Sequence, residues 1–481
     1  MRLYNTLSRT VEPLRTCERG VVRMYTCGPT VYDRAHIGNF RTFVALDLLR
    51  RYLRYRGYRV IQVMNLTDVD DKTIRGAQQA GTDLRTYTDR YIQAFFEDYD
   101  ALRLERVEYY PRATDHIPQM VALIQRLIEK GHAYQSEGSW YFRIASFPNY
   151  GRLSRLDRRS IIEGYRIEAD EYSKEDVRDF VLWKAAKPGE PYWDTPIGRG
   201  RPGWHIECSA MSMHYLGETL DIHGGGVDLI FPHHENEIAQ SEAATGKTFV
   251  RHWVHCAHLI VEGEKMAKSR GNFYTVRQLL DEGVDPVALR YLLLSVHYRK
   301  QLNFTWASLQ AAQEAVFRLQ NIYRRLQTEP HRPDDETDVA DHLNGVMQQF
   351  DAAMDDDLNV SEALAVLFQG VRQWNAWLDR DVIGRPGARK ILDWLDRVDA
   401  VLAVFQVSED TLDEEIARLI ELRHQARLRR DFTTADRIRE NLRRRGIILE
   451  DTRTGTRWRR MTPAEMKAML TRERTPEGEP A

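Results

Sequence analysis

Short apolar runs alternate with longer amphipathic segments in the first part of the chain. The run VRMYTCG at residues 22–28 predicts a strand that ends in a Gly28-Pro29 turn. A helical spacing of apolar positions follows from about Asn39, and a second apolar run extends from Val60 to Leu66. Strand, turn, helix and strand in this order predict a βαβ unit, and therefore a parallel sheet that binds ligands at the carboxyl ends of its strands.

A second alternation of the same kind occurs later in the chain. The run ETLDIHGGGVDLIF at residues 218–231 predicts a strand and a loop, a helix is expected from Pro232, and WVHCAHLIV at residues 253–261 predicts a further strand. The segment between the two alternations, about residues 110–200, is mixed and rich in aromatic residues. We therefore expect one α/β domain in two halves, with residues 110–200 inserted between them.

The pattern becomes helical from about Pro286. Long amphipathic segments predict helices on both sides of the polar, acidic stretch 329–338, which reads as an exposed connection, and helices resume around 339–407 as a bundle. Two short strand-like runs around a turn close the patterned part of the chain. The expected domains are an α/β domain (1–300), a helical bundle (301–407), a small mixed domain (408–470) and a frayed tail (471–481).

Composition limits the class of protein. The 481 residues are 42% hydrophobic and 29% charged, as in globular proteins, and the formal net charge of −2 excludes a uniformly basic protein. The total conceals a local excess, because residues 416–460 hold 14 arginines, no lysine and six acids, a balance of +8. Arginines with Trp458 among them suit phosphate contacts and base stacking, whereas a solvated helix with paired charges is the alternative.

The chain shows no sign of secretion or of a membrane span. No apolar run approaches the ~18 residues of a spanning helix, and the start, MRLYNTLSRT, lacks the apolar core of a signal peptide. Only four cysteines occur, Cys17, Cys27, Cys208 and Cys256, which argues against a disulfide framework. We expect a cytoplasmic protein whose cysteines are core residues, metal ligands or reactive thiols.

Two motifs are suited to phosphate chemistry. His36-Ile37-Gly38-Asn39 lies between the first predicted strand and the start of the predicted helix. The free backbone N–H groups and the positive end of the helix dipole would face a ligand there. The run Lys265-Met266-Ala267-Lys268-Ser269 places two lysines three residues apart in a glycine-flanked loop, which suits a clamp on a negatively charged phosphorus. Taken singly, a structural turn histidine and a solvated basic turn explain them as well.

Together the two motifs resemble the two signatures of class I aminoacyl-tRNA synthetases. Longer strings narrow the resemblance to the cysteinyl-tRNA synthetase family: MYTCGPTVYDRAHIGNFRTF, NLTDVDDK, RPGWHIECSAM, HGGGVDLIFPHHENEIAQSEA, MDDDLNVSEALAVLF and DFTTADRIRENLRRRGIILEDTRTGTRWRR. The resemblance covers nearly the whole chain. Asn39 replaces the last histidine of the first consensus signature and Ala267 the middle serine of the second, and we expect altered detail rather than lost function.

The resemblance implies a fold and a set of metal ligands. The fold is α/β, a Rossmann-like parallel-sheet catalytic domain with an insertion, followed by an α-helical tRNA-binding bundle and a small mixed C-terminal domain that binds the anticodon. The implied ligands of one Zn²⁺ ion are Cys27, Cys208, His233 and Glu237, with His234 as a rival. His233 and Glu237 stand i, i+4 after Pro232, so both side chains can leave one face of a helix. Two thiolates, an imidazole and a carboxylate suit tetrahedral zinc.

The resemblance also implies an activity. It is the activation of L-cysteine with Mg²⁺-ATP to cysteinyl-adenylate and transfer to the 3′ end of tRNA(Cys), with zinc selecting the substrate thiol. A related ligase that delivers cysteine to an amino sugar is the alternative, although it lacks the Arg-rich C-terminal segment. The sequence has no long heptad pattern that would indicate an obligate coiled-coil assembly, so a monomer is expected.

Roles for individual residues follow from the same resemblance. The transition-state phosphates are assigned to His36, Lys265 and Lys268. The ATP-binding residues are His36, Gly38, Asn39, Asp228 and Lys268. The residues of the amino-acid pocket are Thr67, Trp204, His205 and His223. Thr67 and Asp68 have a helix cap as their alternative role, and Cys17 and Cys256 are given none.

Overall fold

The computed structural model describes residues 1–155, 179–330, 332–405, 411–444, 447–452 and 455–460. The chain divides into two compact units. The first unit holds Met1–Pro286, Leu293–Phe304 and Met347–Val366, and the second holds Val287–Leu292, Thr305–Val346 and Leu367–Ala481. The domain boundaries expected from the sequence remain a prediction.

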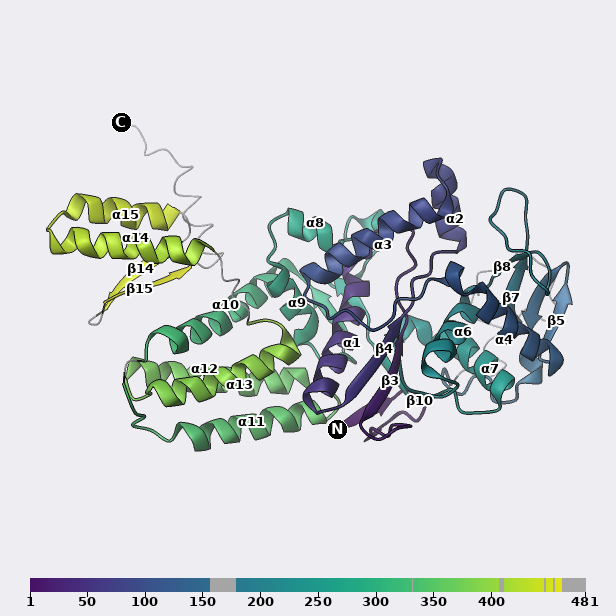
Figure 1. The fold of residues 1–481 in the computed structure, drawn as a ribbon, viewed down its shortest axis with the longest axis horizontal. Coiled ribbons are helices and arrows are strands. Elements are labelled where there is room, and N and C mark those ends of the chain that lie inside the picture. Colours follow the sequence, from purple (N-terminus) through teal and green to yellow (C-terminus); the bar gives the residue numbers. More distant parts are fainter. Residues whose placement is uncertain (156–178, 331, 406–410, 445–446, 453–454, 461–481) are drawn as a thin grey trace. The chain divides into compact units, whose positions relative to one another are not determined.

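A four-stranded parallel sheet forms the centre of the first unit (Figure 1). Its order is β10-β9-β3-β4, from Val250–Cys256, Leu220–Gly226, Val21–Thr26 and Arg59–Met64. The helix α1 (Ile37–Tyr55) crosses from β3 to β4, as the apolar spacing predicts, and buries one broad face. Because the chain leaves the neighbouring strands β3 and β9 toward opposite edges of the sheet, a crevice is expected at their carboxyl ends.

The second half of the α/β domain differs from the sequence expectation in two details. The helix expected from Pro232 begins later, as α7 (Glu235–Thr245), because residues Ile230–His234 form a wider turn with Phe231 in extended conformation. The expected single strand at 253–261 is two strands, β10 and β11 (Leu259–Val261), which belong to different sheets. The apolar run is continuous in the sequence, and its apolar character does not show where one strand ends and the next strand, in another sheet, begins.

Additional elements surround the sheet in the first unit. A hairpin of β1 (Arg2–Asn5) and β2 (Thr10–Pro13) opens the chain. An antiparallel sheet in the order β5-β6-β7-β8 lies within the expected insertion, from Ala133–Ser136, Ser139–Phe142, Phe180–Ala185 and Gly200–Pro202. The three-stranded sheet is β12-β11-β13, with β12 at Glu264–Lys265 and β13 at Leu302–Phe304. The further helices are α2 (Asp71–Ala80), α3 (Leu84–Ala101), α4 (Ile117–Glu129), α6 (Trp204–Leu216) and α8 (Val276–Asp281).

The second unit is mainly helical. It contains α10 (Trp306–Thr328), α13 (Arg385–Leu402), α14 (Thr411–Leu428) and α15 (Phe432–Arg444), and the hairpin of β14 (Ile447–Thr452) and β15 (Gly455–Arg460). The helices α9 (Pro286–Ser295), α11 (Val339–Asp355) and α12 (Val360–Asp379) contribute residues to both units. The expected tail 471–481 lies outside the described residues. Among the helices that the structure describes, none combines the length and the apolar character needed to cross a membrane.

Candidate functional site

A cavity of about 630 Å³ lies at the carboxyl ends of the parallel strands. Residues that follow β3, β9 and β10 line it, together with the start of α1, the start of α6 and the loop after β11. The sequence-predicted residues in its wall are Cys27, His36, Gly38, Asn39, Trp204, Asp228 and Lys265. The parallel sheet therefore brings both signature motifs to one crevice.

His36 caps the helix that begins the first motif. Its Nδ1 accepts a hydrogen bond from the backbone N–H of Asn39 at 3.1 Å, and Oδ1 of Asn39 accepts from the N–H of His36 at 3.2 Å. Burial lowers the pKa of His36, which outweighs the opposing effect of Asp228. The ring is therefore neutral, and because Nδ1 is an acceptor, Nε2 carries the proton. Asn39, which departs from the consensus signature, completes this reciprocal cap.

Gly38 is required by the close packing at the same turn. A Cβ atom at this position would lie 2.9 Å from Nδ1 of His36 and 3.3 Å from Cε of Met266. Any larger residue would displace either the capping ring or the second motif. The glycine therefore keeps the mouth of the crevice open where the two motifs meet.

The lysines of the second motif occupy an exposed loop. Lys265 ends β12 and lines the cavity, whereas Lys268 projects from the next turn, where its Nζ donates to Oδ2 of Asp33 at 2.6 Å. The side-chain hydrogen bond with Asp33 raises the pKa of Lys268. Oδ1 of Asn272 accepts from the N–H of Ala267 at 2.9 Å and so fixes the loop backbone at the second departure from the consensus. Sequence reasoning missed Asp33; its place three residues before His36 was the available signal.

Four buried side chains converge beneath the cavity. One ligand atom each from Cys27, Cys208, His233 and Glu237 lies within 4.8 Å of the others. Their exposures are 8%, 1%, 1% and 0%. Cys27 follows β3, Cys208 lies on α6, and the other two flank the start of α7. Oε1 of Glu237 lies 3.1 Å from Nε2 of His233, so the carboxylate and the imidazole present adjacent ligand atoms.

The electrostatics of this cluster suit a divalent cation. Burial alone would raise the pKa of Cys208, but its hydrogen bond with Cys27 and the neighbouring His233 bring the pKa to about 6. The pKa of Glu237 falls to about 2 despite burial, because His223 and His233 stand beside it. A thiolate and a carboxylate are therefore present in the buried cluster at neutral pH. Two sulfurs, one imidazole and one carboxylate are a donor set that fits zinc.

A second arrangement of ligands shares part of the same cluster. Cys27, His223, His234 and Glu237 also place their ligand atoms within 4.8 Å of one another. Nε2 of His234 lies 3.3 Å from Sγ of Cys27, while its Nδ1 lies 2.8 Å from Nε2 of His255. His234 is thus engaged on both ring nitrogens, and the set with one thiolate has fewer soft donors. The geometry keeps His234 as a rival and gives the chemical preference to the set with two cysteines.

The other predicted pocket residues support the cluster to different degrees. His223 approaches Oε2 of Glu237 at 3.0 Å through Nε2. Trp204 stacks on His233 with ring centroids 4.2 Å apart, and Nδ1 of His205 lies 2.9 Å from Nδ1 of His233. These contacts orient the cluster from outside, as residues around a metal site do.

Thr67 lies apart from the cavity wall. It is 1% exposed and its hydroxyl donates to Oε2 of Glu207 at 3.0 Å, so its role as a substrate contact remains a prediction. The alternative role as a helix cap is wrong for Thr67 and Asp68. Asp70 caps α2, and Asp68 instead accepts hydrogen bonds from Thr114. The cap stands two residues later than the sequence pattern indicated.

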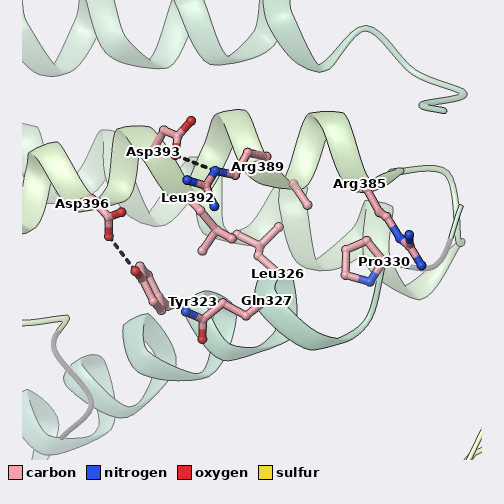
Figure 2. A pocket seen from close by; sticks show the side chains of 10 residues that line it. Tyr323, Leu326, Gln327, Pro330, Arg385, Arg389, Leu392, Asp393 and Asp396 are labelled. Atoms are coloured by element: carbon pink, nitrogen blue, oxygen red, sulfur yellow. Dashed lines mark hydrogen bonds and ion pairs between the residues drawn. The ribbon is translucent and has the colours of Figure 1, made fainter. Parts of the chain in front are cut away.

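A separate groove of about 360 Å³ lies between α10 and α13 in the second unit (Figure 2). Leu326 and Leu392 form part of its floor, Tyr323 donates to Asp396 at 2.6 Å, and Arg389 pairs with Asp393 at 3.0 Å. None of the residues assigned to chemistry lines it. All the residues predicted for chemistry belong to the first unit.

Comparisons with known proteins match nearly the whole length of the chain. Residues 13–314 match the family model described as the tRNA synthetases class I (C) catalytic domain, and residues 349–406 match the DALR domain. The chain is 52% identical over 463 residues to a cysteine--tRNA ligase of Solibacter usitatus, covering 96% of this chain and 99% of that protein. It is 48% identical over 492 residues to a cysteine--tRNA ligase of Koribacter versatilis, with 96% and 99% covered.

Solved structures show the same fold at low sequence identity. Methionyl-tRNA synthetase of Mycobacterium tuberculosis, in complex with methionyl-adenylate, aligns with a TM-score of 0.58 at 17% identity. The alignment covers 79% of this chain and 89% of that one. The expected α/β class, a parallel-sheet domain followed by helices, is confirmed.

Proposed function

The chain belongs to the cysteine--tRNA ligase family of class I tRNA synthetases, and on that premise we propose how its residues carry out the family's reaction. The enzyme activates L-cysteine with ATP and transfers the cysteinyl group to the 3′ end of tRNA(Cys). Both steps take place in the crevice at the carboxyl ends of β3 and β9.

Adenylate formation depends on positioning and charge. The carboxylate of cysteine attacks the α-phosphorus of Mg²⁺-ATP, and pyrophosphate leaves. His36 donates through Nε2–H to the phosphates, since its other ring nitrogen is held by the N–H of Asn39. Lys265 and Lys268 balance the charge that develops on the transferring phosphorus. Asp228 lies in the cavity wall and is assigned to the ribose, and Gly38 gives the nucleotide access to the backbone.

The amino-acid pocket ends at the buried cluster. Cys27, Cys208, His233 and Glu237 are the proposed ligands of one zinc ion. Burial raises the pKa of Cys27, which would lose its proton on binding the metal, and the two thiolates and one carboxylate would then supply the negative charge that such a cation requires. When bound, zinc supplies a soft Lewis acid that prefers a substrate thiolate to a neutral hydroxyl. Trp204 and His205 hold the ring of His233 in place, and Glu237 is held by His223. Shape alone discriminates small groups by only about 1–3 kcal/mol, so this chemical selection removes the need for an editing step.

The tRNA is assigned to the helical bundle and the Arg-rich segment 416–460. Arginines there are suited to phosphates, and Trp458 is suited to stacking on an unpaired base. The guanidinium of Arg324 on α10 already lies over the ring of Trp458, 4.6 Å from its centroid. Cysteine transfer to tRNA rather than to an amino sugar is favoured by the relatives, whose matches extend over 96% of this chain.

The observation that carries the proposal is the convergence of the two signature motifs and the sulfur-containing cluster on one crevice. The purified protein, loaded with zinc, should catalyse cysteine-dependent ATP–pyrophosphate exchange and should charge tRNA(Cys). Serine at the same concentration should support neither reaction. Exchange without charging, together with transfer of cysteine to an amino sugar, would overturn the tRNA assignment.

A further inference from the structure

A buried carboxylate on α3 lies between the two signature motifs. The side chain of Asp98 is 1% exposed, and each of its oxygens faces a different arginine. Oδ2 lies 3.4 Å from Nη1 of Arg34, and Oδ1 lies 3.2 Å from Nη2 of Arg277. The two arginines are 33% exposed, so the carboxylate is the buried member of this three-residue bridge.

The two arginines belong to the segments that carry the signature motifs. Arg34 lies in the loop between β3 and α1, two residues before His36. Arg277 is the second residue of α8, the helix that follows the loop of Lys265 and Lys268. Asp98 therefore connects the loop that leads into the first motif with the helix that follows the second motif.

Backbone contacts bring the same two segments together. The N–H of Ile37 donates to the carbonyl of Tyr274 at 3.0 Å, and His36 and Thr275 form an antiparallel bridge. The ring of His36 meets the ring of Phe273 edge-on, with centroids 5.3 Å apart. The distance between His36 and the lysine loop is thus set by contacts of residues 273–275, close to Arg277, which pairs with Asp98.

The helix that carries Asp98 is itself fixed to the first motif. Phe95 of α3 packs against Phe40 and Phe43 of α1, with ring centroids 5.9 and 5.4 Å apart. Near the other end of α3, the hydroxyl of Tyr87 donates to the carbonyl of Tyr32 at 2.8 Å. A carboxylate on this helix therefore keeps a constant position relative to α1, and it can hold α8 at that position.

We infer that Asp98 is a positioning residue for adenylate formation, which acts through Arg34 and Arg277 by holding the two signature motifs in register. The inference rests on the proposed function. Asp98 does not line the cavity, so it is not placed to contact the substrate. Because a displacement of about 1 Å in a catalytic group costs about 10²-fold in rate, a loosened register reduces the rate of activation without removing a reacting group.

The test compares Asp98→Asn with Asp100→Asn, a variant of the same helix. Asp100 is 57% exposed and pairs at 2.7 Å with Arg106 on the surface, away from both motifs. In Asp98→Asn the kcat of cysteine-dependent ATP–pyrophosphate exchange should fall at least tenfold, while the KM for cysteine and the zinc content stay as in the wild type. Transfer of a preformed cysteinyl group to tRNA should be unchanged. Asp100→Asn should match the wild type throughout.

Arg277→Gln provides a second test that does not empty a buried site, and it applies equally if Asp98→Asn fails to fold. It should lower the kcat of exchange in the same selective way, and the double variant should be no worse than the poorer single variant. A kcat within twofold of the wild type in Arg277→Gln, or an equal loss in activation and transfer, would overturn the inference. A wild-type protein without cysteine-dependent exchange would instead refute the proposed function.

Discussion

Nζ of Lys268 lies 2.6 Å from Oδ2 of Asp33, so the lysine of the second signature is bound to the loop that precedes the first. Both side chains are largely accessible, at 65% and 40% exposure. In the proposed reaction the phosphates of ATP, which carry more charge than one carboxylate, would compete with Asp33 for this lysine. The ion pair therefore holds Lys268, the proposed phosphate-binding group, beside the loop that leads to His36.

Replacing Asp33 by asparagine removes the competing carboxylate. Since an exposed ion pair contributes about 0–1 kcal/mol, the KM for ATP should decrease by no more than about fivefold. The kcat of exchange should change little. Initial rates of ATP–pyrophosphate exchange over a range of ATP concentrations measure both quantities, and an increased KM would show that Asp33 helps to bind ATP.

Lys268→Ala should reduce adenylate formation by about 10²–10³-fold, the usual cost of removing one charge-stabilising group. Zinc content should stay at the wild-type level, because Lys268 lies outside the cluster. Lys247→Ala is the matched control, since Lys247 pairs at 2.7 Å with Glu218 on the surface. A near-normal exchange rate in Lys268→Ala would contradict the assignment.

Cys208→Ser should lose zinc and cysteine affinity together, because one of two soft ligands is replaced by a neutral hydroxyl. Metal analysis of the purified protein and cysteine titration of the exchange reaction measure the two effects. Cys17→Ser serves as the control, because Cys17 is exposed and belongs to neither set of candidate ligands. Unchanged zinc stoichiometry in Cys208→Ser would exclude Cys208 from the site.

The cap at His36 predicts a dependence of stability on pH. Burial lowers the pKa of His36, so the folded protein favours the neutral ring more than the unfolded chain does. The resulting stabilisation is complete above the unfolded pKa of about 6.5 and is lost as the pH falls from there toward the folded pKa. Asparagine caps a helix without titrating in this range, so the Tm of His36→Asn should decline less than that of the wild type between pH 7.5 and 5. Equal declines would show that the ring is not held neutral.

Deletion of the residues after Phe405 should separate the two steps of the reaction. The residues removed include the Arg-rich segment 416–460, whose local charge is +8 from 14 arginines and six acids. Charging of tRNA(Cys) should fall by at least about tenfold, since each lost phosphate contact weakens binding, whereas exchange should remain within about twofold of the full-length enzyme. A parallel loss in both assays would contradict the assignment of tRNA recognition to this segment.

Local sequence patterns determined much of the secondary structure of this protein and the position of its motifs. The apolar spacing located β3, α1 and β4, and the two motifs indicated phosphate chemistry, because secondary structure and helix caps depend on residues close together in the chain. The expected helix at Pro232 begins three residues later and the strand at 253–261 is divided, because the partners of these segments are distant in sequence. The sequence alone showed that Asn39 departs from the consensus signature, but only the structure showed its reciprocal cap with His36.

The meeting of side chains was decided only by the tertiary structure. Cys27 and Cys208 are far apart in sequence, and the chain has no closely spaced pair of cysteines that would indicate a metal site. Their assignment came from the family resemblance. The sheet brings the end of β3 beside α6 and α7, and the neighbouring side chains in the cluster then lower the pKa values of Cys208 and Glu237 despite their burial. Asp98 and Asp33 have no motif at all, since their importance lies in packing between segments, which a one-dimensional pattern does not record.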